Sequence, residues 1–280
     1  FHLDSHTIYI TASIGVVVSS PEYQSAVEII RDADLAMYSA KTNGKARFML
    51  FVPEMRHSVL NRMTLETELH HALDWHELVL YYQPIYETRT GQLHGVEALV
   101  RWRHPTRGLI GPAEFIPIAE SSGFISTITH WLMHEACRQA AEWNSLMPPG
   151  ACPLTFSINL SPTCLRQPDL VHWLEQALRL HGVLPQQLHL EIVETALLEE
   201  VELARRVFGD LRRLGVKVSL DDFGVGYSSL NYLTQYPIDT LKIDRSFVAR
   251  ATEVMQVAAV VRAIAALAHE LNIDVVAEGG

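Results

Sequence analysis

The chain has 280 residues, of which 48% are hydrophobic and 19% charged, and its formal net charge is −10 at pH 7. This composition is that of an ordinary globular protein, which excludes intrinsic disorder and a long coiled coil. The acidic balance also argues against a basic surface for DNA or RNA polymers.

The cysteines and the apolar runs indicate the cellular setting. Three cysteines without a C-x-x-C pair favour a reducing compartment over a disulfide framework or a cysteine zinc site. No uninterrupted apolar run reaches the roughly 18 residues that a membrane helix needs. We therefore expect a cytoplasmic domain, with any membrane anchor upstream of Phe1 in a longer protein.

The first part of the chain predicts a strand, a helix and a second strand. Residues 8–18 are rich in β-branched side chains, residues 26–41 carry apolar side chains at helical spacing, and residues 46–51 again suggest a strand. This is too little to bury a core, so we expect the end of an α+β domain. Residues 55–73 predict a helix that either connects two domains or opens the second one.

From residue 77 onward, strand patterns alternate with helix patterns. The predicted strands cover residues 79–82, 96–100, 154–160, 188–193, 216–220, 240–243 and 273–277. The predicted helices cover residues 116–143, 170–180, 201–214 and 254–271. Strands that alternate with helices in this way predict a parallel sheet.

Polar side chains near the predicted strand ends favour a barrel over an open sheet. They are Glu97, Asn159, Glu191, Asp221, Asp222, Lys242 and Glu278. In a (β/α)8 barrel all such ends converge on one face, whereas in an open sheet they converge only at a switch point. No G-x-G-x-x-G follows the first strand, which disfavours a dinucleotide fold. The predicted fold is an α/β, TIM-type (β/α)8 barrel after an α+β remnant.

The carboxylates in this set suit Mg2+ or Mn2+, which prefer oxygen ligands, rather than zinc. Asp221 and Asp222 are adjacent, and two carboxylates sharing one site repel each other unless cations intervene. Two divalent ions bridged by an aspartate would remove the repulsion and create a site for in-line phosphoryl displacement.

Ordered motifs cover most of the chain. They are Y-Q-P-I at 82–85, E-A-L-V-R at 97–101, S-I-N-L-S at 157–161, E-I-V-E at 191–194, D-D-F-G-V-G-Y-S-S-L at 221–230, L-K-I-D at 241–244 and A-E-G at 277–279. Residues 62–280 thereby resemble the EAL family of cyclic di-GMP phosphodiesterases, without that family's last strand and helix, so we expect the natural chain to continue. Residues 1–52, with A-S-I-G and A-D-L-A-M-Y, resemble the end of a GGDEF (diguanylate cyclase-like) domain, and residues 53–61 form the linker.

The resemblance implies a role for each matching residue. The implied metal ligands are Glu97, Asn159, Glu191, Asp221 and Asp222, with Asp221 bridging two ions. The implied catalytic group comprises Lys242, which holds the attacking water, Glu278 beside it, and Glu194, which braces the loop after Asp222. The implied substrate contacts are Gln83, Leu99 and Arg101.

The implied function is Mg2+- or Mn2+-dependent hydrolysis of cyclic di-GMP to linear pGpG in bacterial second-messenger signalling. The resemblance also implies a homodimer through the EAL domain and upstream GGDEF and sensor regions. Val193, Val225 and Gly280 depart from the family pattern, but no ligand position is substituted. The alternative is a degenerate receptor that binds cyclic di-GMP or a protein partner without cleavage.

His130 and His134 lie one helical turn apart and could hold a metal ion. The neighbouring sequence offers no third ligand, so we interpret them as ordinary histidines of a helix surface.

Overall fold

The computed structural model describes residues 2–3, 6–7, 10–21, 23–42, 44–148, 150, 152–194, 197, 201–224 and 231–279. The chain divides into two compact units, residues 1–71 and 72–280. Among the described residues, no helix combines the length and the apolar character needed to cross a bilayer.

The first unit is built on a β-α-β arrangement, which confirms the predicted strand, helix and strand. Its elements are β1 (His2–Leu3), β2 (His6–Thr7), β3 (Ile14–Val16), α1 (Ala26–Thr42), β4 (Phe48–Leu50) and α2 (Glu54–Ala72). Strands β1 and β2 are antiparallel, and β3 and β4 pair in parallel. Helix α1 packs on β3 closely because Gly15 has no side chain: a Cβ there would lie 1.9 Å from the carbonyl oxygen of Ala33.

A buried ion pair joins α1 to α2 within this unit. The carboxylate of Asp32 is fully buried, and Arg56 Nε donates to its Oδ1 at 2.8 Å. The hydroxyl of Tyr23 donates to Oδ2 at 2.9 Å. The hydrogen bonds from Arg56 hold the pKa of Asp32 below its ordinary value despite its burial. The pair therefore fixes the start of α2 on α1.

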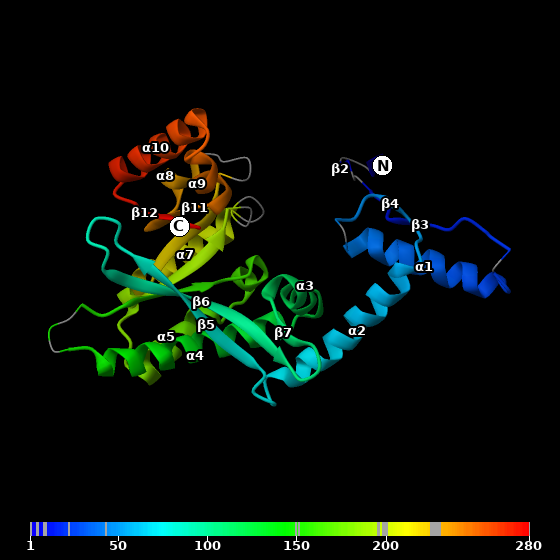
Figure 1. The fold of residues 1–280 in the computed structure, drawn as a ribbon, viewed down its shortest axis with the longest axis horizontal. Coiled ribbons are helices and arrows are strands. Elements are labelled where there is room, and N and C mark those ends of the chain that lie inside the picture. Colours follow the sequence, from blue (N-terminus) through cyan, green and yellow to red (C-terminus); the bar gives the residue numbers. More distant parts are fainter. Residues whose placement is uncertain are drawn as a thin grey trace. The chain divides into compact units, whose positions relative to one another are not determined.

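The second unit contains one curled, mixed sheet with helices packed along it (Figure 1). Its strands are β5 (Leu78–Tyr86), β6 (Leu93–His104), β7 (Gly108–Ile110), β8 (Thr155–Asn159), β9 (Leu188–Val193), β10 (Lys217–Phe223), β11 (Thr240–Ile243) and β12 (Asp274–Ala277). Their spatial order is β12-β11-β10-β9-β8-β6-β5, and β7 pairs with β6. The strands from β6 through β8 to β12 run parallel in chain order, as in a TIM-like barrel, so the predicted fold class is confirmed.

Helices and short 3-10 turns connect these strands. They are α3 (Pro112–Ser122), α4 (Ile125–Leu146), η1 (Pro162–Arg166), α5 (Leu170–His181), η2 (Pro185–Gln187), α7 (Val201–Leu214), α8 (Asn231–Gln235), α9 (Arg245–Ala251) and α10 (Met255–Glu270). Helix α7 buries Ala204, Val207, Phe208 and Leu211, the i, i+3, i+4, i+7 stripe of a helix that covers a core. Leu188 to Ile192 in β9 are all buried, which is typical of a strand covered on both faces.

The parallel sheet predicted from the alternation is wrong for β5, and the short strand β7 was not predicted. Strand β5 is antiparallel to β6, and so is β7. The connection between β5 and β6 is a tight turn, in which Glu87 N donates to Gln92 O at 2.9 Å and Gly91 adopts φ +69°. Such a short connection can only join antiparallel neighbours, because a parallel pair needs a crossover.

The single helix predicted over residues 116–143 is also wrong. Gly123 adopts φ +78° and ends α3, and α4 begins two residues later. A left-handed glycine is a common helix terminator, and here it lets the chain turn between two helices that both carry apolar faces.

Candidate functional site

The predicted strand-end residues lie together on one side of the second unit. Asn159 is the last residue of β8, and Glu278 directly follows β12. Glu191 lies inside β9, where the strand register pairs it with Asn159. Glu97 and Lys242 lie inside β6 and β11. Some of these side chains thus stand within strands rather than at their ends.

Lys242 lies at the centre of an acidic group that we call the carboxylate cluster, comprising Glu97, Glu191, Asp221, Asp222 and Glu278. Its Nζ lies 2.7 Å from Glu191 Oε2, 2.8 Å from Glu278 Oε1, 3.0 Å from Glu97 Oε2 and 3.2 Å from Asp221 Oδ1. The side chain of Lys242 is only 3% exposed. One buried ammonium group therefore contacts four carboxylates from four strands or strand ends.

A bulge in β10 brings the two adjacent aspartates to the same side. Successive side chains of a regular strand point to opposite faces. Between Leu220 and Phe223 the register with β11 shifts, and Asp222 adopts φ +54°. Asp222 N donates to Asp221 Oδ1 at 3.0 Å. A bulge of this kind redirects a side chain at the cost of a strained backbone angle.

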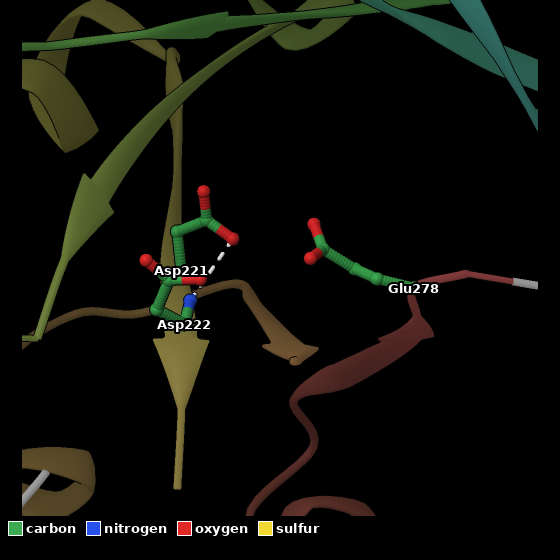
Figure 2. Close-up of side chains that lie close together, drawn as sticks. All are labelled: Asp221, Asp222 and Glu278. Carbon is green, nitrogen blue, oxygen red and sulfur yellow. Dashed lines mark hydrogen bonds between the residues drawn. The ribbon is translucent and has the colours of Figure 1, made fainter. Parts of the chain in front are cut away.

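Figure 2 shows the result, with the carboxylates of Asp221 and Asp222 on β10 turned toward that of Glu278 after β12. One oxygen of each lies within 4.8 Å of the others. Three carboxylates at this spacing can serve as ligands of a hard divalent ion.

The cluster carries more negative charge than Lys242 neutralises. Burial, and then the charges of Glu97 and Asp221, raise the pKa of Glu191 above its ordinary value. Burial also raises the pKa of Asp222 and of Glu278. Burial opposes the charged form of Lys242, but the surrounding carboxylates raise its pKa well above the ordinary value. The ammonium is thus charged, and the surplus negative charge is what divalent cations would neutralise.

A cavity of about 780 Å3 opens beside the cluster, with one acidic and one apolar wall. Asn159 contributes to the acidic wall and donates from Nδ2 to Glu97 Oε1 at 2.7 Å. Ile116, Ile128 and Leu132 of α3 and α4 line the apolar wall. A site of this size and mixed lining suits a ligand with both flat apolar and anionic parts.

The predicted substrate contacts divide into two groups. Gln83 lies opposite Glu97 in the strand register, and Gln83 and Leu99 both line the cavity. Arg101 is not among the described residues of the lining, and its Nη1 donates to Val100 O at 2.8 Å. The structure therefore brings two of the three residues to the cavity.

Glu194 follows β9 directly and is 5% exposed. The loop that it is predicted to brace includes residues 225–230, which lie outside the described ranges, as does Gly280.

Sequence reasoning missed two charged residues of the cavity, Glu120 and Arg245. Ser161 Oγ donates to Glu120 Oε1 at 2.6 Å. Arg245 packs against Gly279, where an added Cβ would lie 2.8 Å from the Arg245 Cβ. Glu120 gave no signal because a glutamate in a helix pattern is usually solvated. Arg245 directly follows the quoted L-K-I-D motif, and that position could have identified it.

Two family models match the chain. The model described as EAL domain matches residues 66–279, and the one described as diguanylate cyclase, GGDEF domain, matches residues 1–47.

Similar proteins carry both segments. The bifunctional diguanylate cyclase/cyclic di-GMP phosphodiesterase MucR of Pseudomonas aeruginosa is 38% identical over 279 residues, which are 100% of this chain and 40% of that protein. The cyclic di-GMP phosphodiesterase PdeR of Escherichia coli is 38% identical over 279 residues, or 100% of this chain and 42% of that protein. The chain thus spans about two fifths of the length of these relatives.

A solved structure, the PaMucR phosphodiesterase in complex with c-di-GMP, has a similar fold. Its TM-score is 0.72 at 40% sequence identity, and the match covers 78% of this chain and 87% of that one.

Proposed function

The chain belongs to the EAL domain family, and from this premise we propose that it hydrolyses cyclic di-GMP to linear pGpG with the help of divalent metal ions. The observation that supports the proposal most directly is the carboxylate cluster with its central lysine, beside a cavity large enough for a nucleotide ligand. The relatives' names and the c-di-GMP complex of the similar structure point to the same substrate.

The residues of the cluster fit Mg2+ or Mn2+. All five side chains offer carboxylate oxygens, the ligand that both ions prefer, and Asn159 adds an amide oxygen. The surplus negative charge around Lys242 favours the binding of a cation. We assign one ion to Glu97, Asn159, Glu191 and Asp221, and a second to Asp221 and Asp222. Bound there, the ions would neutralise phosphate charge and lower the pKa of a water molecule.

The chain's own residues would position the reactants. The ammonium of Lys242 has three N–H donors and contacts four carboxylates, so it would donate a hydrogen bond to the attacking water once a carboxylate turns from it toward a metal ion. Glu278, 2.8 Å from Lys242 Nζ, would accept a hydrogen bond from the same water and orient it. The water oxygen would form a bond to one phosphorus as the bond from that phosphorus to the 3′ oxygen breaks; the proton that the water loses would pass to Glu278, and the 3′ oxygen would take up a proton from solvent.

The cavity would hold the rest of the dinucleotide. We assign one guanine to the part of the cavity that Gln83 and Leu99 line. The apolar wall of α3 and α4 would cover the flat face of a base. Arg101 would contact a phosphate only after its side chain turns toward the cavity, whose described lining does not include it. Glu194 would act through the loop after Asp222 rather than on the substrate.

The test is chromatography of cyclic di-GMP after incubation with the chain in Mg2+ or Mn2+. We expect linear pGpG from the natural chain and intact substrate from the Glu97→Ala variant. Glu202→Ala is the matched control, since Glu202 is an exposed acid of α7. Binding of cyclic di-GMP without cleavage under either metal would identify a receptor instead of an enzyme.

The whole protein's organisation is part of the proposal, because the relatives are longer than this chain. We propose that residues 1–52 end a GGDEF domain, that residues 62–280 form the phosphodiesterase domain, and that an upstream sensor region regulates it. We also propose a homodimer through the phosphodiesterase domain. Sedimentation of the chain at increasing concentration tests the dimer, and a monomer throughout would contradict it.

A further inference from the structure

Three histidines lie together where α4 meets α5. His130 and His134 belong to α4, and His181 is the last residue of α5. The imidazole centroids of His130 and His134 are 4.8 Å apart, and those of His134 and His181 are 5.8 Å apart. We call these three residues the histidine cluster. The described lining of the cavity beside the carboxylate cluster does not include them.

The sequence interpretation of His130 and His134 lacked a third ligand, and the fold places a third histidine, His181, beside His134. Residues four apart on a helix share one face, so both imidazoles project toward the same neighbour. That neighbour is α5, which packs along α4 and ends at His181. All three side chains are partly buried, and the Trp173 ring packs edge-on against His130 at 5.3 Å.

Two of the ring-centre distances are close to the spacing of two imidazoles on one metal ion. With metal–nitrogen bonds of about 2.0–2.1 Å and tetrahedral angles, two ligating imidazoles have ring centres roughly 5 Å apart. The observed centroid distances of 4.8 and 5.8 Å lie on either side of that value. Burial, and then the charges of His130 and His181, lower the pKa of His134, which favours the neutral imidazole that a metal requires.

We propose that His130, His134 and His181 form a second metal site, for Zn2+ or a similar transition ion, which holds the end of α5 against α4. Three imidazoles without a carboxylate select Zn2+, Ni2+ or Cu2+ over the Mg2+ or Mn2+ that suits the carboxylate cluster. Within the described chain only Asp221, Asp222 and Glu278 already bring three ligand atoms within 4.8 Å of one another. The imidazoles must therefore turn about their side-chain torsions to meet one ion, with water as the fourth ligand.

The test is a titration of the tag-free 280-residue chain with Co2+ in excess Mg2+, followed by the visible absorption of Co2+. We expect one equivalent with the intense bands of low-coordinate Co2+, and displacement of those bands by Zn2+. His130→Ala, His134→Ala and His181→Ala should each weaken this binding by more than about tenfold, since even outer-shell partners of a metal are worth roughly 10–100-fold. His172→Ala is the control, an exposed histidine of α5.

Two further measurements distinguish loss of the histidine site from loss of the fold and from Co2+ binding at the carboxylate cluster. The melting temperature of each variant in chelator shows whether it folds, and His181→Ala, at the helix end, is the least disruptive. The same titration of the Asp222→Ala chain removes a ligand of the carboxylate cluster, and the Co2+ bands should remain. Bands that persist in all three histidine variants, bands lost in Asp222→Ala alone, or their absence from the natural chain would each overturn the proposal. The phosphodiesterase assay does not enter this test, so the two proposals fail independently.

Discussion

Some charged side chains of the second unit are buried, and Lys242 is the clearest example. Its ammonium is buried among carboxylates and holds four strands or strand ends together. Removing one partner from a buried ion pair typically costs about 3–5 kcal/mol, because the other charge is left uncompensated. Lys242 should therefore matter for folding as well as for chemistry.

We expect Lys242→Ala to lower the free energy of unfolding by about 3–5 kcal/mol in chelator, and Mn2+ to restore much of this loss by replacing the missing positive charge. Turnover should fall by roughly two to four orders of magnitude even with Mn2+, while affinity for cyclic di-GMP is retained. Urea unfolding with and without Mn2+, with product chromatography, measures both effects. Lys242→Met keeps the side-chain length but removes the charge, and it should show the same losses of stability and turnover. A stable Lys242→Met variant in chelator would show that volume, not charge, is decisive.

His189 gives a prediction about acid stability. It is 6% exposed and lies in β9, with Nδ1 3.4 Å from Ser219 Oγ. Burial, followed by the charges of Lys217 and His94, lowers its pKa from 6.5 to about 4. The unfolded chain therefore binds a proton that the folded chain excludes as the pH falls from 6.5 to 4. This removes roughly 3 kcal/mol of stability over that window, by the linkage of pKa to folding.

We expect His189→Gln to lose less stability than the natural chain between pH 7 and pH 4.5. Urea unfolding at the two pH values measures the difference, and comparison with the natural chain cancels the carboxylates that titrate in the same range. His172→Gln is the control on an exposed histidine. Equal pH dependence in the natural chain and His189→Gln would mean that His189 accepts its proton in the folded state.

At the scale of the element, the bulge in β10 places Asp222 beside Asp221, as the two-ion site that we propose requires. Asp222 has φ +54°, an angle that asparagine and aspartate tolerate and that β-branched residues strongly disfavour. The backbone role and the ligand role of Asp222 can therefore be separated by the choice of substitution.

We expect Asp222→Asn to keep the melting temperature and lose most turnover, because the side chain keeps its shape but not its charge. Asp222→Val should lose turnover and also about 1–2 kcal/mol of stability, because the bulge is strained. Thermal unfolding in chelator and product chromatography test the pair. Equal stability of the two variants would contradict the strain that we assign to the bulge.

Strand β6 depends on a glycine close to the cluster. A Cβ at Gly95 would lie 2.0 Å from Thr155 Oγ1 and 2.6 Å from the Thr155 carbonyl oxygen, so the β6–β8 pair leaves no room for a side chain. We expect Gly95→Ala to separate these strands and weaken the 2.7 Å hydrogen bond between Asn159 and Glu97. Overpacking typically costs about 1–3 kcal/mol, and metal affinity should fall with it. Gly111→Ala, where no atom lies within 4 Å, is the control.

The sequence predicted most elements of this unit but not how they are joined. Apolar periodicity identified β9 and α7, because their buried residues form a continuous run in the strand and recur at every third or fourth residue in the helix. It could not reveal that β5 runs antiparallel, since strand direction depends on the turn at Gly91 and not on the strand itself. It also missed the end of α3 at Gly123, because the apolar pattern continues on both sides.

The candidate site was likewise predicted only in part from the sequence. The carboxylates were found because their residue types recur beside predicted strands, and the family resemblance supplied their roles. The central place of Lys242, the bulge at Asp222 and the inclusion of Glu120 were not predictable, because they depend on side-chain packing between distant segments. His181, the third histidine near His134, was missed for the same reason, because the packing of α5 on α4 brings together residues that are distant in sequence.

At the scale of the whole molecule, the net charge of −10 and the carboxylate cluster lead us to expect a stability that depends on divalent cations. Any ion that binds only the folded chain stabilises it by about 2.7 kcal/mol at a hundred times its dissociation constant. We expect Mg2+, Mn2+ and Ca2+ all to raise the melting temperature, and chelator to lower it. Only Mg2+ and Mn2+ should support turnover, because Ca2+ tolerates looser geometry and misplaces water and phosphate.

Differential scanning calorimetry and product chromatography with each ion test this separation of binding from chemistry. Glu97→Ala should reduce the shift with every ion, whereas Glu202→Ala should not. Full turnover with Ca2+ alone would contradict the expected geometry, and no shift with any ion would contradict metal binding at the cluster.

The hairpin of β5 and β6 sets an order for assembly of the sheet. Its strands are joined by residues 87–92, whereas β6 reaches β8 only after residues 105–154. Loop closure costs more entropy as the loop lengthens, so the hairpin can form before any parallel pair. During synthesis it would present Glu97 on an ordered strand while the later ligands are still being made. Pulse-labelled hydrogen exchange should then protect amides of β5 before those of β9, and simultaneous protection would rule this order out.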